Sequence, residues 1–338
     1  MDSPARGGPT RIGRYDIEDV LGQGGMGRVY LARDSVLGRR VALKVLRDDL
    51  GLPPETKRAL LSRMQNEARA AAAISHPGIV TLHDMGEDDA LGLYLVFEYV
   101  EGPTLRERIA RGPLPLEEVA EIAERLGDAL SVAHAAGVIH RDVKPENVIL
   151  AKTGPKIADF GIARAPDSTL TQSQNVFGTP AYSAPEALRV GDFSDASDQF
   201  SFAATLYEAI TGERAFRGED ALAVATSVTK DPPPPLSASL GDPRVLGRVE
   251  AVLARGLAKE PDRRYPSSAE LGSALARIIR EPPPPSLSSQ IARTPGPPSS
   301  MTRTSTPPPA PAENLRAYAE APVRPSLVMR QQTHRVQN

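Results

Sequence analysis

The stretch HRDVKPENVIL at residues 140–150 constrains the fold more than any other part of the sequence. It places six polar or charged side chains within eight positions and then continues as an apolar run. A surface loop does not require the apolar run, and a buried strand does not tolerate so many unpaired charges. We therefore expect a polar, functional loop held in place by a buried strand. The alternative is a solvated loop that happens to precede a strand.

Composition limits the classes of protein to which the chain can belong. Its 338 residues suffice for two lobes with cores of their own. A net charge of −2 provides no basic field for anionic polymers, so we expect no nucleic-acid partner. The chain contains no cysteine, which excludes disulfides and thiolate metal sites and fits a reducing cytoplasm. No signal peptide and no run of about 18 uncharged apolar residues is found, which predicts a cytoplasmic protein without a membrane span.

The end of the sequence differs in composition from the rest. Residues 281–338 contain 13 of the 33 prolines and a single aromatic residue. Such a segment cannot bury enough apolar surface to offset the entropy lost on ordering, so we predict a disordered Pro-rich tail. Residues 1–11 are predicted to form a short disordered lead. The folded domain is then expected at 12–280, with a smaller lobe at 12–100 and a larger lobe at 101–280.

Hydrophobic patterning divides the folded domain into two parts. Residues 15–50 alternate between apolar and polar positions, which predicts antiparallel strands joined by glycine-containing turns. Residues 55–74 predict one amphipathic helix, and two further strands follow before residue 100. Residues 116–136 and most of 196–280 predict helices. We therefore expect an α+β fold, in which a small antiparallel sheet with one helix precedes a mainly helical part.

The segment LGQGGMGRV contains Gly22, Gly24 and Gly27 at G-x-G-x-x-G spacing. The run continues into a β-like segment and not into a helix, which argues against a dinucleotide-binding fold. It also lacks the lysine and hydroxyl residue of a P-loop. A glycine turn between two strands can bring backbone N–H groups close to phosphates, because no side chains intervene. A flexible hairpin without a ligand is the alternative.

The segment VALK places Lys44 within an apolar strand, where a lysine requires a partner unless it points to solvent. Lys44 shares a strand face with Ala42. If this face lies beneath the glycine turn, Lys44 points at phosphates and needs a carboxylate. The predicted helix offers Glu55 and Glu67, and Glu67 lies beside its alanine-rich face. A solvent-facing Lys44 and a solvated Glu67 are the alternatives.

The polar loop is followed by a DFG segment at residues 159–161, and the two together indicate a chemical role. Asp142 can accept the proton of an attacking hydroxyl, and Lys144 can neutralise charge on a transferred phosphoryl group. Asn147 and Asp159 offer hard oxygens that suit Mg²⁺, with Mn²⁺ as a second choice, on the phosphates of ATP. Taken singly, Asp142 and Asp159 could be ordinary loop acids and His140 a core histidine. This alternative does not explain why HRD-x-K-x-x-N is followed by DFG.

In this order the motifs resemble the signature set of protein kinases. They are G-x-G-x-x-G-x-V, VALK, a helix glutamate, HRDVKPEN, DFG and APE. In detail the chain is similar to the bacterial Hanks-type (eukaryotic-like) serine/threonine kinases over about residues 12–280. The resemblance implies a bilobal protein-kinase fold and transfer of the γ-phosphoryl group of Mg-ATP to protein substrates. HRD-x-K-x-x-N, and Gly178 and Thr179 before APE, resemble the serine/threonine class more than the tyrosine class.

The resemblance also implies roles for individual residues. The expected ATP-binding residues are Leu21, Gly22, Gln23, Gly24, Gly25, Gly27, Val29, Ala42, Lys44, Phe97, Glu98, Val100, Asn147 and Asp159. The expected catalytic residues are Asp142 as base, Lys144, Lys44 and its partner Glu67, with Asn147 and Asp159 as metal ligands. Phe97 would be the gatekeeper, and the backbone of Glu98 and Val100 would bind adenine. The expected structural residues are Glu186, its partner Arg264, and Asp198, which would brace the catalytic loop.

Control is expected at the activation loop, residues 162–183. By resemblance, Arg141 binds a phosphate on this loop, and Thr171 and Ser173 are the autophosphorylated positions. An ordinary polar loop is the alternative. Many relatives continue into a membrane span and a sensor, whereas this chain continues into the Pro-rich tail.

Partners are expected to be proteins with serine or threonine acceptors. The tail carries a net charge of about +3 and polyproline runs that can bind aromatic grooves, although a solvated tail without partners is equally open. By resemblance a homodimer through the smaller lobe is a further candidate, although nothing in the sequence itself indicates one. Two rival functions are a pseudokinase scaffold and a small-molecule kinase. The filled catalytic positions oppose the first, and the GTPAYSAPE segment, which resembles a peptide-docking surface, opposes the second.

Overall fold

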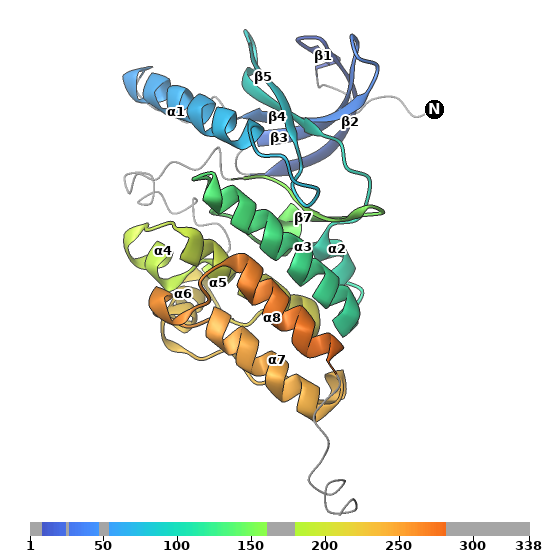
Figure 1. Cartoon of the computed structure of the whole chain (residues 1–338). Coiled ribbons are helices and arrows are strands. Elements are labelled where there is room, and N and C mark those ends of the chain that lie inside the picture. Colours follow the sequence, from blue (N-terminus) through green and yellow to red (C-terminus); the bar gives the residue numbers. More distant parts are fainter. Residues whose placement is uncertain (1–8, 25–26, 47–53, 161–179, 282–338) are drawn as a thin grey trace, which may run out of the picture. The chain divides into compact units, whose positions relative to one another are not determined.

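A computed structural model of the chain describes residues 9–24, 27–46, 54–160 and 180–281 (Figure 1). The chain divides into two compact units, Met1–Pro284 and Pro285–Asn338, and all described residues belong to the first. The predicted tail therefore lies outside the described residues except for Glu281. None of the helices in the described ranges combines the length and the hydropathy that a bilayer crossing requires.

The first part of the chain forms an antiparallel sheet of six strands within the described residues. In spatial order they are β1 (Arg11–Ile12), β2 (Tyr15–Gly24), β3 (Gly27–Asp34), β4 (Arg40–Leu46), β6 (Gly92–Glu98) and β5 (Leu82–Asp88). Strand β1 was not predicted, and Arg11 lies inside the expected lead although it pairs with Asp16. A two-residue strand is too short to produce a recognisable alternation.

The two faces of β4 separate as the alternation predicts. Val41 and Leu43 are fully buried in a cluster on one face of the sheet. Ala42 lies against the second cluster, which continues into the helical part of the chain. Lys44 therefore shares the face that is directed at the helical part, because successive strand residues alternate between faces.

One helix accompanies the sheet. Helix α1 (Pro54–Ala72) contacts β5, with Met64 and Ala68 buried, and lies beside the sheet in Figure 1. Its start at Pro54 follows the preference of proline for the first helical turn. The helix predicted for residues 55–74 is thus present, with both ends displaced by one or two residues.

The second part of the chain is mainly helical. Its helices are α2 (Leu105–Ile109), α3 (Leu116–Ala135), α4 (Pro185–Val190), α5 (Asp195–Thr211), α6 (Ala221–Lys230), α7 (Pro243–Gly256) and α8 (Ser268–Arg280). Fourteen of the residues of α5 are buried, so α5 runs through the core.

Helices α3 and α8 approach each other at two glycines. A Cβ atom on Gly272 would lie 2.1 Å from the Ala123 carbonyl oxygen, and one on Gly127 would lie 2.6 Å from that of Ser268. Neither position can hold a side chain at this separation. Figure 1 shows the two helices side by side.

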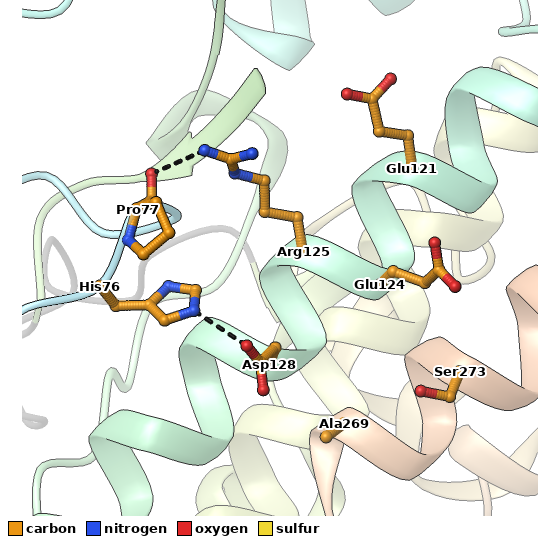
Figure 2. Close-up of a pocket in the computed structure, with 8 residues that line it drawn as sticks. All are labelled: His76, Pro77, Glu121, Glu124, Arg125, Asp128, Ala269 and Ser273. Atoms are coloured by element: carbon orange, nitrogen blue, oxygen red, sulfur yellow. Dashed lines mark hydrogen bonds and ion pairs between the residues drawn. The ribbon is translucent and has the colours of Figure 1, made fainter. Parts of the chain in front are cut away.

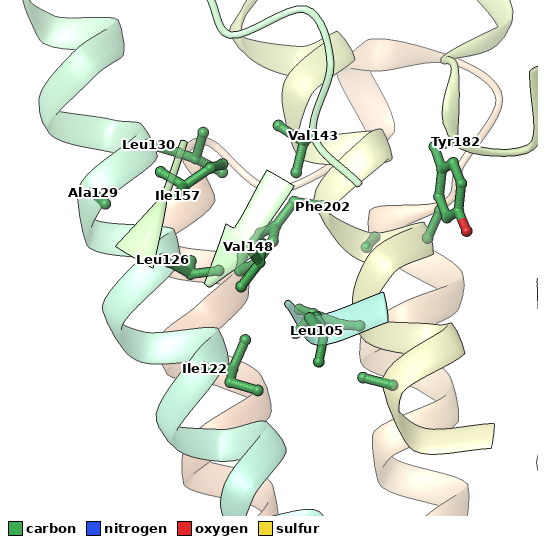
Figure 3. Close-up of a cluster of buried hydrophobic side chains, with 14 of the residues drawn as sticks. Leu105, Ile122, Leu126, Ala129, Leu130, Val143, Val148, Ile157, Tyr182 and Phe202 are labelled. Atoms are coloured by element: carbon green, nitrogen blue, oxygen red, sulfur yellow. The ribbon is translucent and has the colours of Figure 1, made fainter. Parts of the chain in front are cut away.

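The apolar run after the polar loop forms a short hairpin of β7 (Val148–Ala151) and β8 (Gly154–Ile157). Val148 and Ile157 are fully buried and point into the cluster that contains Leu126 of α3 and Phe202 of α5 (Figure 3). The backbone of Ile157 exchanges hydrogen bonds with residues 78 and 80, which follow α1. The polar loop is therefore held by a buried strand, as expected.

Candidate active site

The polar loop begins with a braced turn. The carboxylate of Asp198, in the first turn of α5, accepts hydrogen bonds from the backbone N–H of His140 at 2.6 Å and of Arg141 at 2.8 Å. His134 Nε2 lies 2.8 Å from the same carboxylate. Arg141 has a φ of 64°, a left-handed conformation that costs about 1–2 kcal/mol for a residue other than glycine. The two bonds to Asp198 hold this turn in place.

His140 links the loop to the segment that precedes Asp159. Its side chain is fully buried, with the ring centroid 4.6 Å from that of Phe160. Burial lowers the pKa of His140, so the ring is neutral at neutral pH. Its Nε2 lies 2.9 Å from the Ala158 carbonyl oxygen, and its Nδ1 accepts the Asp142 N–H at 3.2 Å. His140 is thus a core histidine that orients both polar segments.

Two donors converge on the carboxylate of Asp142. Lys144 Nζ lies 2.8 Å from Oδ2, and Asn147 Nδ2 donates to the same oxygen at 3.1 Å. Asn147 also donates to the Asp142 carbonyl oxygen at 2.8 Å, because the 3₁₀ turn Pro145–Asn147 folds the chain back. An acid, a lysine and an amide are thereby gathered at one point.

Lys44 and Glu67 do not form the expected pair. Lys44 Nζ lies 2.7 Å from Asp159 Oδ1, and the lysine side chain is 13% exposed. Glu67 Oε1 instead lies 2.9 Å from Arg141 Nη1 and 3.3 Å from Arg63 Nε. The expected Lys44–Glu67 contact is therefore not formed in this arrangement.

Lys44 and Glu67 each bind another oppositely charged partner, and sequence periodicity cannot predict which partner a charged side chain binds. Strand alternation predicts the face of Lys44, and helix periodicity predicts the face of Glu67, but neither ranks the partners available on that face. Here two guanidinium groups satisfy Glu67, and Asp159 satisfies Lys44. Asp159 has a φ of 61°, a second left-handed residue beside the site.

The glycine turn lies between β2 and β3, where Gly24 and Gly27 are paired and Gly25 lies outside the described residues. Gly27 has a φ of 145°, and a Cβ atom there would lie 1.9 Å from the Val45 carbonyl oxygen. The sheet itself therefore requires this glycine. A Cβ atom on Gly22 would meet no atom within 4 Å, so the sheet does not require the glycine at position 22.

The remaining expected ATP-binding residues lie on or next to this sheet. Strand pairing places Val29 opposite Lys44 and Ala42 opposite Phe97. Phe97 is 9% exposed, and Leu21 is 46% exposed. The other members of the set are Gln23, which accepts a hydrogen bond from Arg28, Glu98 at the end of β6, and Val100, which is half-buried. Thr171 and Ser173 lie outside the described residues.

The larger part contains the expected Glu186–Arg264 contact. Arg264 Nη1 and Nη2 lie 2.6 Å and 2.8 Å from the two Glu186 oxygens. The arginine side chain is 0% exposed and that of Glu186 is 8% exposed. The pair joins the start of α4 to the segment before α8.

Sequence reasoning missed two contacts at the site. Lys156 Nζ lies 2.7 Å and 2.9 Å from the two carboxylate oxygens of Glu98. Arg106 lies between Glu146 of the polar loop and Glu208 of α5 and also donates to Tyr182. No local sequence pattern indicates either contact, because each joins segments that are distant in the chain.

A hollow of about 510 Å³ lies away from these residues (Figure 2). Residues of α3 and α8 form much of its lining, and it contains none of the expected site residues. At its edge His76 Nε2 lies 3.0 Å from Asp128, and Arg125 donates to the Pro77 carbonyl oxygen at 3.3 Å. These contacts fasten the segment after α1 to α3.

The comparisons with known proteins agree with this geometry. Residues 15–242 match the protein kinase domain family. The chain belongs to the protein kinase family. The expected resemblance is thereby confirmed, and so is the bilobal α+β fold. This kinase is similar to the serine/threonine-protein kinase PknA of Mycobacterium tuberculosis, with 43% identity over 290 residues, 83% of this chain and 65% of PknA.

Two further similarities extend the comparison. The serine/threonine-protein kinase PknB of Mycobacterium leprae is 43% identical over 285 residues, 82% of this chain and 44% of PknB. The kinase chain thus spans less than two thirds of these relatives. Among solved structures, Rad53 1–466 in complex with AMP-PNP matches with a TM-score of 0.63 and 25% identity, over 79% of this chain and 65% of that chain.

The donor atoms of this kinase suit a small divalent cation. Asn147 uses its amide nitrogen for Asp142, and no donor among the described residues bonds its amide oxygen. Asp159 engages Lys44 through one carboxylate oxygen. Mg²⁺ usually takes one or two protein oxygens and completes its shell with water and phosphate. No group of three or more His, Cys, Asp or Glu residues in the described ranges forms a metal cage of protein alone.

Proposed function

We propose that this kinase transfers the γ-phosphoryl group of ATP to serine and threonine hydroxyls of proteins in bacterial signalling. The observation that carries the proposal is the convergence of Lys144 and Asn147 on the Asp142 carboxylate. Asp142 would orient the acceptor hydroxyl and take its proton. Lys144 would offset the negative charge that develops on the phosphoryl oxygens. The names of the PknA and PknB relatives support serine/threonine specificity.

ATP would lie between the glycine turn and the polar loop. The backbone at Glu98 and Val100 would bind the base, with Val29 and Ala42 against its faces. Lys44 would hold the phosphates, while Asn147 and Asp159 would hold Mg²⁺ or Mn²⁺. When bound, the metal ion supplies positive charge to the phosphate oxygens. The similar Rad53 structure is a complex with AMP-PNP, which supports an adenine nucleotide as the ligand by analogy.

The observed ion pairs fit a kinase before activation. Lys44 is bound to the proposed metal ligand Asp159, and Glu67 is bound to the proposed phosphate-binding residue Arg141. A phosphate on Thr171 or Ser173 would carry about −1.5 to −2 charges and would compete with Glu67 for Arg141. Glu67 would then be released to pair with Lys44. Autophosphorylation at one or both positions is therefore part of the proposal.

The first experiment is intact-mass analysis of the full chain after incubation with Mg-ATP, with and without a generic serine/threonine protein acceptor. We expect phosphate increments in the parent chain. Lys44→Met and Asp159→Asn should lower transfer by about 10²-fold or more, because each removes part of the phosphoryl-transfer machinery. Lys152→Met removes an exposed lysine of the β7–β8 turn and should behave as the parent. Equal transfer by Lys44→Met and the parent would refute the proposal.

Activation is tested separately. Fragmentation of the modified chain should place phosphate on Thr171, Ser173 or both. Thr171→Ala with Ser173→Ala should abolish the rise in activity that follows preincubation with Mg-ATP. Active enzyme without phosphate on either residue would contradict this part of the proposal.

The remaining expectations are proposals of the same kind. A homodimer is supported by Val36 and Leu37 in the β3–β4 turn, which are 72% and 61% exposed. Leu37→Glu should then lower the solution mass measured by light scattering, and an unchanged mass would contradict the dimer. The boundaries at residues 12 and 280, a cytoplasmic location and partners of the Pro-rich tail stay predictions from the sequence.

A further inference from the structure

The ion pair between Lys156 and Glu98 joins two segments that the proposed reaction uses at opposite ends of ATP. Lys156 lies in β8, three residues before Asp159, and its side chain is 13% exposed. Glu98 is the last residue of β6 and begins the connection between the sheet and the helical part. Both carboxylate oxygens of Glu98 lie within 2.9 Å of Lys156 Nζ.

Strand β8 is itself firmly placed. The Ile157 N–H donates to the Gly78 carbonyl oxygen at 2.8 Å, and its carbonyl oxygen accepts the Val80 N–H at 2.9 Å. The Ala158 N–H donates to the carbonyl oxygen of Asn147 at 2.8 Å. Lys156 therefore projects from a strand whose position is fixed relative to the polar loop. An ion pair with Lys156 therefore holds the bound residue at a fixed position relative to the polar loop.

The carboxylate of Glu98 has few contacts, although the backbone of this residue is paired with Val41 in the β4–β6 ladder. Its backbone N–H donates to the Thr81 carbonyl oxygen at 2.8 Å, and its carboxylate accepts the Thr81 N–H at 3.3 Å. Within the described residues, the Glu98 carboxylate is 29% exposed, and without Lys156 it would keep only the long bond from Thr81. The side chain could then turn to solvent, and the connection beside it would lose a charge-assisted anchor.

We infer that Lys156 is a positioning residue for nucleotide binding: through Glu98 it holds the adenine-binding connection at a set distance from Asn147 and Asp159. The inference rests on the proposed function, because it assumes that adenine binds at Glu98 and Val100. Lys156 itself would touch neither the nucleotide nor the acceptor. It acts by keeping the base and the phosphates of one ATP molecule in register with their two binding segments.

The expected effect is a loss of affinity and not of turnover. Contacts that are equally strong in the ground state and the transition state change KM and leave kcat alone. Lys156→Met in the full chain should weaken Mg-ADP binding and raise the KM for ATP by about 5- to 10-fold, the scale of a partly exposed charge-assisted contact. The affinity for adenosine should fall by the same factor, because the lost anchor lies at the base.

Controls separate positioning from general damage. Lys156→Arg keeps the charge and should restore affinity to within about 2-fold, since a guanidinium also binds both carboxylate oxygens. Lys152→Met, in the same hairpin, should leave Mg-ADP binding, the KM for ATP and adenosine binding unchanged. If Lys156→Met does not fold, as judged by circular dichroism, Glu98→Gln tests the same contact with little change in shape. It should give the same losses.

Several results would overturn the inference. Unchanged Mg-ADP and adenosine affinity in Lys156→Met or Glu98→Gln is one. A lower kcat with unchanged adenosine affinity is another, because it would place the role at the Asp159 end. Mg-ADP binding is measured without an acceptor, so a parent chain that binds Mg-ADP but transfers no phosphate refutes the proposed function alone. A parent chain that does not bind Mg-ADP refutes both.

Discussion

The buried pair of Arg264 and Glu186 gives the most direct test of what holds the larger lobe together. Arg264 donates to both carboxylate oxygens and to the carbonyl oxygens of Ala196 at 2.7 Å and Ala258 at 2.9 Å. Its side chain is 0% exposed. Arg264→Met keeps much of the volume but leaves a carboxylate and two carbonyl groups without their donor.

The size of the stability loss is set by the Glu186 carboxylate, which stays buried in Arg264→Met. Breaking one partner out of a buried ion pair costs about 3–5 kcal/mol of unfolding free energy, because the other charge stays in a site of low polarity. For a domain of this size that loss corresponds to about 10 °C in Tm. Adding Glu186→Gln to Arg264→Met should return about 1–2 kcal/mol, since the double variant no longer buries a charge.

Urea unfolding followed by far-ultraviolet circular dichroism measures both values, which suits a chain without tryptophan. Arg248→Met is the matched control, because its pair with Glu281 is 30% and 50% exposed and should contribute less than about 1 kcal/mol. Equal losses of stability in Arg264→Met and Arg248→Met would contradict this prediction, and so would a double variant that is less stable than Arg264→Met alone.

Two further predictions concern packing and pH. Gly272→Val should lower the free energy of unfolding in urea by about 3 kcal/mol or more, because its Cβ would meet the backbone of α3. Gly247→Ala in α7 meets no atom within 4 Å and should stabilise the fold by up to about 1 kcal/mol, so equal effects of the two variants would contradict the close approach of α3 and α8. Burial beside Phe216 lowers the pKa of Lys259 from 10.5 to about 8, so the unfolded chain binds more protons between these values. The stability of the parent relative to Lys259→Met should therefore increase as the pH rises from about 8 to 10.5, and a flat difference would refute this.

Local patterns predicted most of the fold. Alternation in residues 15–50 identified the faces of β4, and the helix at residues 116–136 emerged as α3 with one residue fewer at its end. These signals are strong because burial on one face imposes a period on the sequence. Strand β1 escaped prediction because two residues show no period.

The sequence identified residues that lie together at the candidate site, but it did not predict all of the contacts between them. Asp142, Lys144 and Asn147 lie together because they are close in the chain and the 3₁₀ turn Pro145–Asn147 folds Asn147 back onto Asp142. The partner of Lys44 depends on how α1 and the segment at Asp159 are placed, and distances between distant segments leave no period in the sequence. The Lys156–Glu98 contact spans 58 positions and was missed for the same reason.

The left-handed backbone at Arg141 and Asp159 has a consequence for redesign. In the described ranges these are the two residues other than glycine with positive φ. A library selected for thermal stability alone would favour glycine at both positions, because glycine adopts this conformation without steric cost. Such a selection would remove the guanidinium and the carboxylate first. Stabilised variants of this chain should therefore be screened with both positions held constant.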